Sequence, residues 1–442
     1  MNYIFENIDE ITYTDTQKES VFKKTVFAVL YIWMYQYIHT HYLSGIWGYL
    51  GYLNNGIDFS NVILFYIIGL IPIYFYSGLI KISSYFSILI YLLVYIPIVV
   101  TLSYNNTDIL GFEKVLYYQV LLAIGMIFFF VADKIPIIRT KNLSFNFSMN
   151  WFHLFTLIVS VYLLVLFSGN IRLVGFDDAY QLRSENYEAS DTISAYFTMW
   201  ATYLIYPVYF SLGLVKNSKK YLFFGVLGHI LIYMIMGTKA SLVMPIVLLF
   251  FYFLLSKKWK LSFFQILSLS VVLFTFLIYI GGDYLFILGS LFIVRTLSMP
   301  GLLFSQYMSF FDSNPNTHYS HIGIINSLTN AYPYGDEPLG MVVGWGIYNN
   351  GTNANANFWA TDGVAANGLA GIILISLIVF AFLVFLNNFY NNKRSLLFIL
   401  VSTGPIFSLL NASFFTTLVS GGLLLMIFFF ILFNPFEQIT VE

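Results

Sequence analysis

The sequence of 442 residues contains no cysteine, and charged residues make up only 9 % of it. Without cysteine the chain has no disulfide bond, thiolate metal site or cysteine nucleophile. An ordinary soluble domain has about 25 % charged residues. The 20 Lys and Arg residues are balanced by 21 Asp and Glu residues, so there is none of the basic excess that binds nucleic acid. We therefore expect no nucleic-acid partner.

Apolar residues take the place of the missing charge. Hydrophobic residues make up 59 % of the chain and aromatic residues 20 %, more than a soluble globule of this size could bury. At about 20 residues per membrane span, this predicts an all-α, polytopic integral membrane protein with about 12 transmembrane helices, forming a single membrane domain over residues 1–442. The expected spans are 25–45, 61–80, 84–103, 115–132, 151–169, 193–215, 220–236, 241–256, 262–281, 366–387, 395–411 and 417–433.

The cationic residues divide unequally between the two sides of these spans. Of the 20 Lys and Arg residues, 15 fall on the side that holds both chain ends. Because cytoplasmic loops are enriched in Lys and Arg, this predicts that both termini are cytoplasmic. Residues 1–24 are polar and acidic, which argues against a cleaved signal peptide. The five cations on the outer side are Lys114, Arg172, Arg183, Lys239 and Arg295.

Two large loops are expected on the outer side, at about 170–192 and 282–365. Residues 284–311 of the second loop are apolar, but Arg295 and Pro300 interrupt them. We expect a re-entrant or interfacial helix pair there rather than a thirteenth span. No cytoplasmic connector is comparably large, so chemistry or recognition is expected on the extracytoplasmic face.

The first outer loop contains Arg172 and Arg183, which are 11 residues apart. On a continuous helix this spacing returns nearly to the same face. Two guanidinium groups are well suited to a diphosphate, because each can bind oxyanions through two hydrogen bonds. The alternative is that they only order the loop, by pairing with its acidic residues Asp177, Asp178, Glu185 or Glu188.

The adjacent carboxylates Asp177 and Asp178 have two interpretations: a base or metal ligand, or a pair of solvated loop residues. No other residues have metal-ligand spacing, and the six histidines form no metal-binding motif, so no metal is expected. Lys239 lies in a tight outer turn, where it could contact a phosphate or extend to lipid headgroups.

Arg295 is the strongest single-residue signal, because a charge in an apolar stretch requires a partner or a polar cavity. His318 and His321 are three residues apart, which would place both on one face of a helix. Either histidine could act as a general base near neutral pH. The alternative for each is a solvated loop histidine.

Asn353, Asn355 and Asn357 alternate along the chain. In an extended segment they would project to one side and offer hydrogen bonds to sugar hydroxyls. The alternative is turn formation and capping of the following span. Asp362 is expected to shape the start of that span, and Gly368 and Gly371 to allow close helix approach.

Three segments resemble Wzy-type O-antigen and capsule repeat-unit polymerases. Residues 353–372, NANANFWATDGVAANGLAGI, resemble the family's signature before a late span. Residues 295–311, RTLSMPGLLFSQYMSFF, resemble its R…P…Y…F segment. Residues 237–254 are similar to its short G-x-R turn and the apolar run that follows. Lys239 stands where an arginine is commoner in the family.

The resemblance implies an integral-membrane, GT-C-like glycosyltransferase at the periplasmic face of the bacterial inner membrane. Its donor and acceptor would be undecaprenyl-diphosphate-linked glycans, with no cofactor. A chain-length regulator and a flippase are possible partners. The leaving diphosphate would be stabilised by the outer cations Arg172, Arg183, Lys239 and Arg295. The expected base is His321 or His318, or failing these Asp177, Asp178 or Glu185. Asn353, Asn355, Asn357 and Asp362 would position a sugar or the catalytic loop.

Other functions remain open. An O-antigen ligase would share the fold and donor but transfer glycan to lipid A-core. A polyprenyl-monophosphate sugar transferase usually has acidic residues in its first outer loop, and here that loop offers only Asp58. A transporter of lipid-linked units is disfavoured because the spans are almost free of charge and no broken helix is expected. A purely structural role would leave Arg295 unexplained.

Overall fold

The computed structural model describes residues 20–137, 145, 147–257, 259–348, 353–354, 358–389 and 395–433. Every element named in these residues is helical, and one isolated bridge joins Phe147 to Phe433. The first elements are α1 (Val21–Ile38), η3 (His39–Leu43), α2 (Ser44–Ile46), η4 (Gly48–Leu50), α3 (Phe59–Leu70), η5 (Ile71–Phe75), α4 (Ile82–Ile90), η6 (Tyr91–Tyr95), α5 (Ile96–Asn105), α6 (Thr107–Leu110), α7 (Phe112–Val131) and η7 (Ala132–Lys134).

The second half of the chain continues in the same way. Its first group is α8 (Met149–Leu166), α9 (Ala179–Ala189), α10 (Thr192–Trp200), η8 (Ala201–Ile205), α11 (Tyr206–Val215), α12 (Lys219–Met236) and α13 (Lys239–Ser256). The last group is α14 (Phe263–Gly281), η9 (Gly282–Leu285), α15 (Phe286–Leu288), η10 (Gly289–Ser298), α16 (Met299–Phe310), α17 (Gly323–Thr329), α18 (Leu339–Tyr348), α19 (Ala360–Asn387), α20 (Ser395–Leu409), α21 (Phe414–Val419) and α22 (Leu423–Leu432).

Within the described residues, nine helical segments are long and apolar enough to cross a membrane. The chain is therefore a helical, polytopic membrane protein, as the composition predicts. The nine segments match nine of the twelve expected spans. Of the other three, 61–80 and 395–411 coincide with the shorter apolar helices Phe59–Phe75 and Leu396–Leu409, and 25–45 is not among the nine. The total of twelve remains a prediction.

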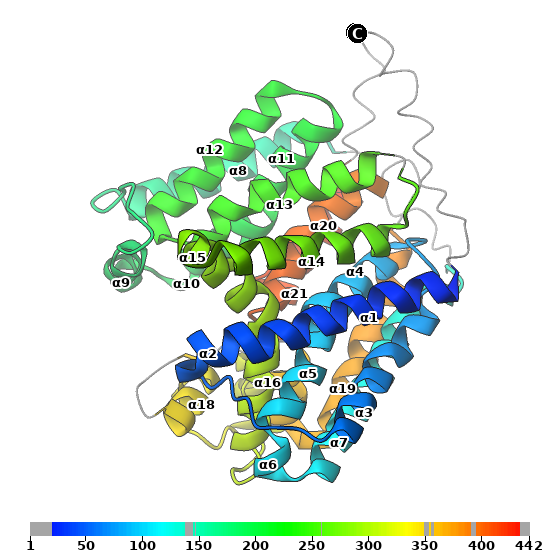
Figure 1. The fold of residues 1–442 in the computed structure, drawn as a ribbon. Helices are drawn as coiled ribbons and strands as arrows, with labels where there is room; N and C mark the ends of the chain where they lie inside the picture. Colours follow the sequence, from blue (N-terminus) through cyan, green and yellow to red (C-terminus); the bar gives the residue numbers. More distant parts are fainter. Residues whose placement is uncertain are drawn as a thin grey trace.

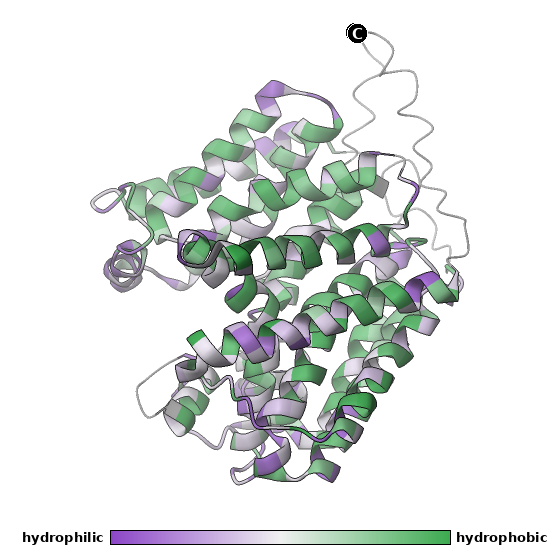
Figure 2. Cartoon of the chain, viewed as in Figure 1, coloured by the Kyte–Doolittle hydropathy of each residue, from purple (hydrophilic) through white to green (hydrophobic). Residues whose placement is uncertain are grey.

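The helices pack into two neighbouring groups (Figure 1). One contains α8 and α11–α13 with α20, and the other contains α1, α3–α7, α16 and α19. The helical segment from Ile82 to Asn105 is buried on all sides, so it lies at the centre of the second group. Hydrophobic residues cover the helices, while hydrophilic residues gather at α9 and at helix ends (Figure 2).

The helix around Arg295 and Pro300 corrects one expectation. Helical structure continues from Phe286 to Phe310 without the predicted interruption. Pro300 lies in the first turn of α16, where proline is tolerated, and the preceding turns form the π-helix η10. α16 is buried against α5 and α19, which argues against an interfacial helix. Residues 263–310 form one apolar helical segment of 48 residues, so the re-entrant form stays a prediction.

A second correction concerns α19, which contains a break. Asn367 (φ −152°, ψ 30°) and Gly368 (φ 58°, ψ −130°) are not helical, and the conformation of Gly368 is one that glycine adopts readily. The break releases the carbonyls of Ala365 and Ala366, which accept hydrogen bonds from the backbone N–H groups of Thr317 (2.7 Å) and His318 (2.9 Å). The expectation that no span is broken is therefore wrong. Its physical cause is a glycine whose left-handed conformation the helical pattern did not reveal.

Close helix approach is confirmed at Gly371 but not at Gly368, where the nearest atom to an added Cβ is the Tyr118 hydroxyl oxygen at 4.0 Å. A Cβ atom added to Gly371 would collide with the backbone of Gly363, and one added to Gly363 would collide with Ile372. The two parts of α19 therefore pack backbone to backbone next to the break. This contact holds the first turn of α19, with Asp362, in a fixed place.

Candidate functional site

The predicted site residues form two separate groups, one around Tyr180 and one around Asp362. The first group depends on how α9 and the loop before it pack against the C-terminal end of α12. The Arg172 N–H donates to Met234 O (3.2 Å), the Tyr233 hydroxyl to Val174 O (2.9 Å), and the Asn186 amide to Ile235 O (2.5 Å). Two backbone carbonyls and one tyrosine hydroxyl near the end of α12 thus hold these residues in place.

Arg183 completes that docking as a helix cap. Its Nε donates to Met236 O and its Nη2 to Gly237 O, both at 3.2 Å. These carbonyls lie at the C-terminus of α12, where a cation is favoured by the helix dipole. Gly237 has φ 57°, and a Cβ atom there would collide with the backbone of Ala179. The turn before Lys239 therefore requires glycine, because α9 lies directly against it.

Three cations from three different segments meet at the ring of Tyr180. Arg183 lies over the ring (Cζ 5.5 Å from the centroid), and so does Lys239 (Nζ 5.1 Å), while Arg295 Nη2 donates to the Tyr180 hydroxyl (2.7 Å). We call Arg183, Lys239, Arg295 and Tyr180 the Tyr180 cluster. Tyr180 is 51 % exposed and Arg295 is exposed, so the cluster is open to a ligand. In the part of the chain that the structure describes, none of the three cations has a carboxylate within ion-pair distance.

Arg172 behaves differently from these three cations. Its Nη2 lies 2.6 Å from Glu185 Oε2 in a half-exposed ion pair. The hydrogen bond from Arg172 lowers the pKa of Glu185, so this carboxylate is a weaker base than an isolated one. Arg172 and Arg183 do not share a helix face, because Arg172 lies before α9 begins. For Arg172 the structure matches the alternative, in which it pairs with an acidic residue of its own loop. Asp177 and Asp178 are exposed in the turn between Arg172 and Arg183.

The second group is built on a turn that precedes α17. His318 (φ 50°) and Tyr319 (φ 64°) are both left-handed, so the prediction that His318 and His321 share a helix face is wrong. Two consecutive left-handed residues cannot continue a right-handed helix. His318 Nδ1 instead contacts Asn367 Oδ1 (2.6 Å), at the break in α19. The turn is therefore anchored to that break through both backbone and side chain.

His321 and Asp362 form a buried pair. His321 Nε2 lies 3.5 Å from Asp362 Oδ1, and the two side chains are 5 % and 0 % exposed. His321 Nδ1 is 2.7 Å from Thr317 Oγ1, whose hydroxyl donates to Ala365 O. The Thr317 oxygen is then free to accept a hydrogen bond from Nδ1–H. In this tautomer Nε2 has no proton, and neither Nε2 nor Asp362 Oδ1 has a hydrogen-bond partner among the described residues.

Asp362 does not cap its own helix in the expected way. It lies in the first turn of α19, but its Oδ2 accepts the N–H of Phe414 (2.8 Å), the first residue of α21. One carboxylate thus joins α19, the turn at residues 317–321 and α21. The sequence indicates Asp362 and His321 as separate candidates; their pairing depends on the break in α19 and could not be predicted.

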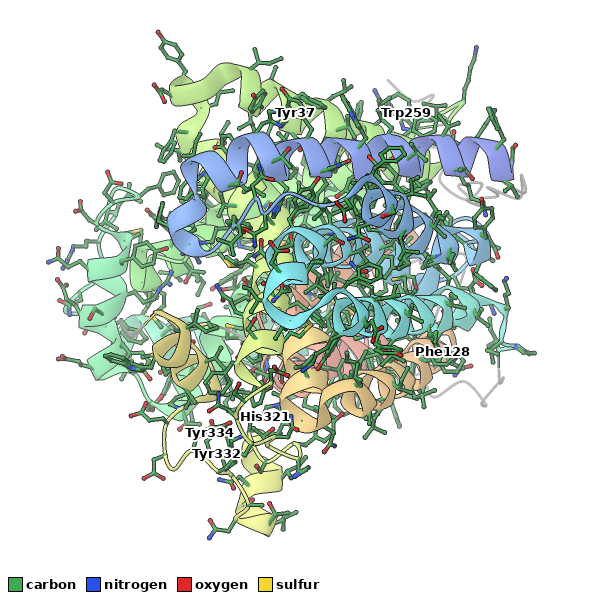
Figure 3. The ribbon with its side chains drawn as sticks, turned by 60° about the horizontal axis from the view of Figure 1, so that its bottom comes forward. Tyr37, Phe128, Trp259, His321, Tyr332 and Tyr334 are labelled. Carbon is green, nitrogen blue, oxygen red and sulfur yellow. The ribbon has the colours of Figure 1, made fainter. Side chains whose placement is uncertain are left out.

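A pocket of about 220 Å³ lies beside His321. His321, Tyr332 and Tyr334 lie together at one end of the molecule (Figure 3). Sequence reasoning missed the other polar residues of this pocket, because they lie in a turn-rich loop without periodicity. The pocket is lined by Ser320, His321, Gly323, Asn326, Tyr332, Gly335, Asp336, Glu337, Pro338 and Leu339.

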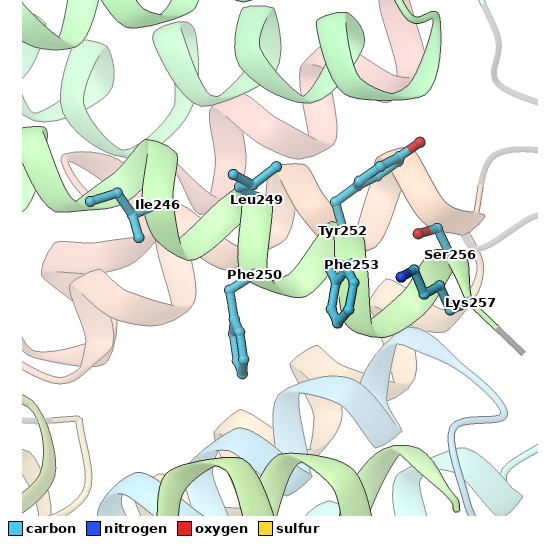
Figure 4. Close-up of a pocket in the computed structure, with 7 residues that line it drawn as sticks. All are labelled: Ile246, Leu249, Phe250, Tyr252, Phe253, Ser256 and Lys257. Atoms are coloured by element: carbon cyan, nitrogen blue, oxygen red, sulfur yellow. The ribbon is translucent and has the colours of Figure 1, made fainter. Parts of the chain in front are cut away.

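The asparagine row is described only in part. Asn353 is exposed. The next residue, Ala354, donates its N–H to Gly340 O (2.8 Å), and its carbonyl accepts a hydrogen bond from the Tyr307 hydroxyl (2.9 Å). Asn355 and Asn357 lie outside the described residues. A larger pocket of about 510 Å³ lies along α13 (Figure 4) and contains none of the predicted site residues. In the described ranges, no three His, Asp or Glu residues are grouped to hold a metal ion.

Comparison with known proteins gives no match: no protein-family model, no curated protein and no solved structure is significantly similar to this chain.

Proposed function

We propose that this protein is a membrane glycosyltransferase that polymerises undecaprenyl-diphosphate-linked oligosaccharide repeat units into O-antigen or capsular polysaccharide. The observation that carries the proposal is the Tyr180 cluster, where three cations without a carboxylate partner converge from three segments. Three like charges held this close, with no carboxylate beside them among the described residues, favour an anion, and a diphosphate would supply it. The resemblance to Wzy-type polymerases supports the same substrate.

In the proposed reaction, a hydroxyl oxygen of the acceptor attacks the anomeric carbon of the donor. The new C–O bond forms as the bond from that carbon to the lipid diphosphate breaks, and the diphosphate leaves with the electron pair. Arg183, Lys239 and Arg295 stabilise the leaving diphosphate. A base takes the hydroxyl proton as the new bond forms. His321 is the first candidate by residue type, and it could act only once its Nε2, which is buried against Asp362 at 3.5 Å, becomes accessible to the acceptor. No metal or cofactor takes part in this scheme.

The proposal assigns the other predicted residues smaller roles. Arg172 and Glu185 keep the docked loop in place through their ion pair. His318 fixes the turn through Asn367 and is a positioning residue rather than the base. The reaction would occur at the periplasmic face of the bacterial inner membrane in a GT-C-like bundle with cytoplasmic termini, alongside a flippase and a chain-length regulator.

The direct test is polymerisation by the purified protein with a synthetic undecaprenyl-diphosphate repeat unit, read as a glycan ladder on a gel. Arg295→Ala should lower the rate about 100-fold or more, the usual loss when one such charge-stabilising group is removed. Lys219→Ala is the matched control, since Lys219 is an exposed cation at the opposite end of α12 from Arg183, and it should keep the ladder. A ladder that survives Arg295→Ala would remove Arg295 from the site.

The same assay separates the alternative functions. Transfer onto added lipid A-core without a ladder would identify a ligase. The break in α19 beside the buried Asp362 favours a transporter as the second candidate, because broken helices with ionisable residues are typical of transport sites. If neither glycan product forms, movement of the lipid-linked unit across reconstituted vesicles, abolished by Asp362→Asn, would support transport instead.

A further inference from the structure

Helix α13 carries a long apolar groove on its exposed side (Figure 4). The groove has a volume of about 510 Å³, and Ile246, Leu249 and Phe253 are among its apolar lining residues. Ile246 is 67 % exposed and Leu249 51 %, although both lie in a helix that is long and apolar enough to cross a membrane. The other side of α13, with the buried residues Leu248 and Phe251, faces the bundle. The groove is therefore open to lipid.

The length of the groove matches one leaflet of a bilayer. From Ile246 to Lys257 the chain advances 11 residues, which is about 17 Å at the rise of an α-helix. Half of the hydrocarbon core of a bilayer is about 15 Å thick. Lys257 directly follows the last residue of α13, so the groove runs from about the middle of the membrane to the level of the headgroups. One acyl chain would fill this length.

Lys257 is held at the end of the groove by two aromatic residues. Its Nζ lies 4.0 Å from the centroid of the Phe253 ring, and the Trp259 ring packs edge-on against Phe253 with centroids 5.5 Å apart. The Trp259 indole donates to Leu254 O (3.1 Å), one of the carbonyls near the C-terminus of α13. Among the described residues, no carboxylate lies within ion-pair distance of Lys257. The ammonium N–H groups that point away from the ring can therefore bind an anion.

Two other lysines show the contrast with Lys257. Lys24 Nζ donates to Tyr76 O (2.6 Å), and Lys81 Nζ donates to Ile135 O (2.7 Å). Their ammonium groups thus stabilise the packing of the chain itself. Lys257 instead lies over an aromatic ring at the end of an open groove.

The charge of the surrounding sequence is of one sign. Between Asp191 and Asp283 the chain contains seven lysines and no acidic residue, and six of the seven fall within residues 216–220 and 257–260. The turn at Gly237 joins α12 to α13, so these two segments belong to the same side of the membrane. A zwitterionic headgroup would bring a further cation to this side, whereas an anionic headgroup brings only negative charge.

We infer that the groove binds an anionic glycerophospholipid, with one acyl chain along Ile246, Leu249 and Phe253 and the phosphate at Lys257. The apolar wall, the length of one leaflet and the excess of lysine together support this occupant. One lysine near a membrane surface favours an anionic lipid by about five-fold. The inference requires only that α13 crosses the membrane, so it goes beyond the proposed function and does not depend on it.

The test uses the full chain in bilayers that mix phosphatidylglycerol and phosphatidylcholine with the same acyl chains. One of the two lipids carries brominated chains, which quench a nearby fluorophore. Because the chain has no native cysteine, a single bimane label can be placed at Val243→Cys, one turn before Ile246. At low salt, phosphatidylglycerol should bind at this probe about five-fold or more tightly than phosphatidylcholine.

A second probe shows whether the preference belongs to the groove. Leu277 lies on α14, is 59 % exposed and does not line the groove. At Leu277→Cys, the two lipids should quench to within about two-fold of each other, because no lysine lies beside that part of α14.

Two variants assign the preference to Lys257. Lys257→Gln should lower the preference at the Val243 probe about five-fold, the contribution of one lysine. Lys23→Gln removes the same charge from an exposed residue at the start of α1, in the other group of helices, and should leave the preference unchanged. Raising the salt concentration should weaken the preference of the unsubstituted chain.

Three results would overturn the inference. They are equal quenching by the two lipids at the Val243 probe, an equally large preference at the Leu277 probe, and a preference that survives Lys257→Gln. None of these results bears on the glycan ladder, which tests the polymerase proposal separately. A protein without a ladder that shows the preference keeps the lipid site, and only the polymerase proposal fails.

Discussion

At the scale of single residues, the pairing of His321 with Asp362 is the feature that a sequence cannot reveal. The two residues are 41 positions apart in the chain, and they are neighbours where the turn that contains the left-handed pair His318–Tyr319 is anchored to the break in α19. The side-chain chemistry of His321 and Asp362 was sufficient to identify each as a candidate site residue. Their contact required the structure. The same holds for Tyr180, whose role as the meeting point of three cations has no sequence signal.

Substituting Asp362 by asparagine separates its two roles. Asp362→Asn keeps an oxygen that can accept the Phe414 N–H, so the start of α21 should remain capped. It removes the charge that would stabilise a protonated His321, and with His321 as the base we expect the polymerisation rate constant kcat to fall about 100-fold or more. Steady-state kinetics should show little change in KM for the lipid-linked donor.

The control is Asp362→Ala, which removes both the charge and the cap. This variant should lose kcat equally and also unfold at a lower temperature than Asp362→Asn, since a lost helix cap costs about 1 kcal/mol. An asparagine variant with wild-type kcat would show that Asp362 is only structural.

At the scale of elements, the break in α19 organises the site. The predicted span at 366–387 matches a helix of sufficient length, and the predicted close approach is found at Gly371. At Gly368 the prediction is wrong, because this residue forms the break and has no close neighbour. The left-handed Gly368 was not predictable, because an isolated glycine in an apolar run is equally compatible with a continuous helix. The carbonyls of Ala365 and Ala366 that the break exposes hold residues 316–318.

Replacing Gly368 tests the importance of the break. Gly368→Ala forces a Cβ atom onto a residue with φ 58° and ψ −130°, a region essentially restricted to glycine. We expect a loss of about 1–3 kcal/mol in stability of this region. Hydrogen exchange at the N–H groups of Thr317 and His318 should be faster, because their acceptors move.

The matched control is Gly323→Ala. Gly323 lies at the start of α17, does not have a positive φ, and a Cβ atom there would have no neighbour within 4 Å. Gly323→Ala should leave hydrogen exchange at Thr317 and His318 and the melting temperature of the protein unchanged. Equal behaviour of the two alanine variants would mean that the break is not what holds the turn.

At the scale of the whole molecule, composition was the most informative property. The apolar content predicts a polytopic helical membrane protein, and nine of the expected spans match helices of sufficient length. The expected span at 25–45 is less apolar because it contains polar residues whose partners lie inside the bundle. Gln36, for example, donates to the Tyr104 hydroxyl (2.9 Å) and accepts from Tyr66 (2.8 Å). A hydropathy pattern cannot register such internal pairing.

The predicted orientation can be measured directly, because the chain has no native cysteine. A single cysteine at Asp336→Cys should react with a membrane-impermeant maleimide added from the periplasmic side. A single cysteine at Lys219→Cys should react only after the inner membrane is opened, because the excess of Lys and Arg predicts that this end of α12 is cytoplasmic. Both positions are exposed, so lack of access from one side reports the membrane and not burial.

The reversed labelling pattern would place both termini outside. In that case the periplasmic polymerase would no longer be tenable, whatever the contacts at Tyr180 and His321.

The carboxylate of Asp362 also has a consequence for the order of events during synthesis. Its partner Phe414 lies 52 residues later in the chain. When the helix that begins near Asp362 leaves the ribosome and enters the bilayer, the residues that start α21 have not yet been made. The carboxylate of Asp362 therefore lacks its Phe414 hydrogen bond until nearly the whole protein has been translated. Assembly of this centre is consequently one of the last steps of biogenesis, and chains that stop before residue 414 should be recognised as unfinished by membrane proteases.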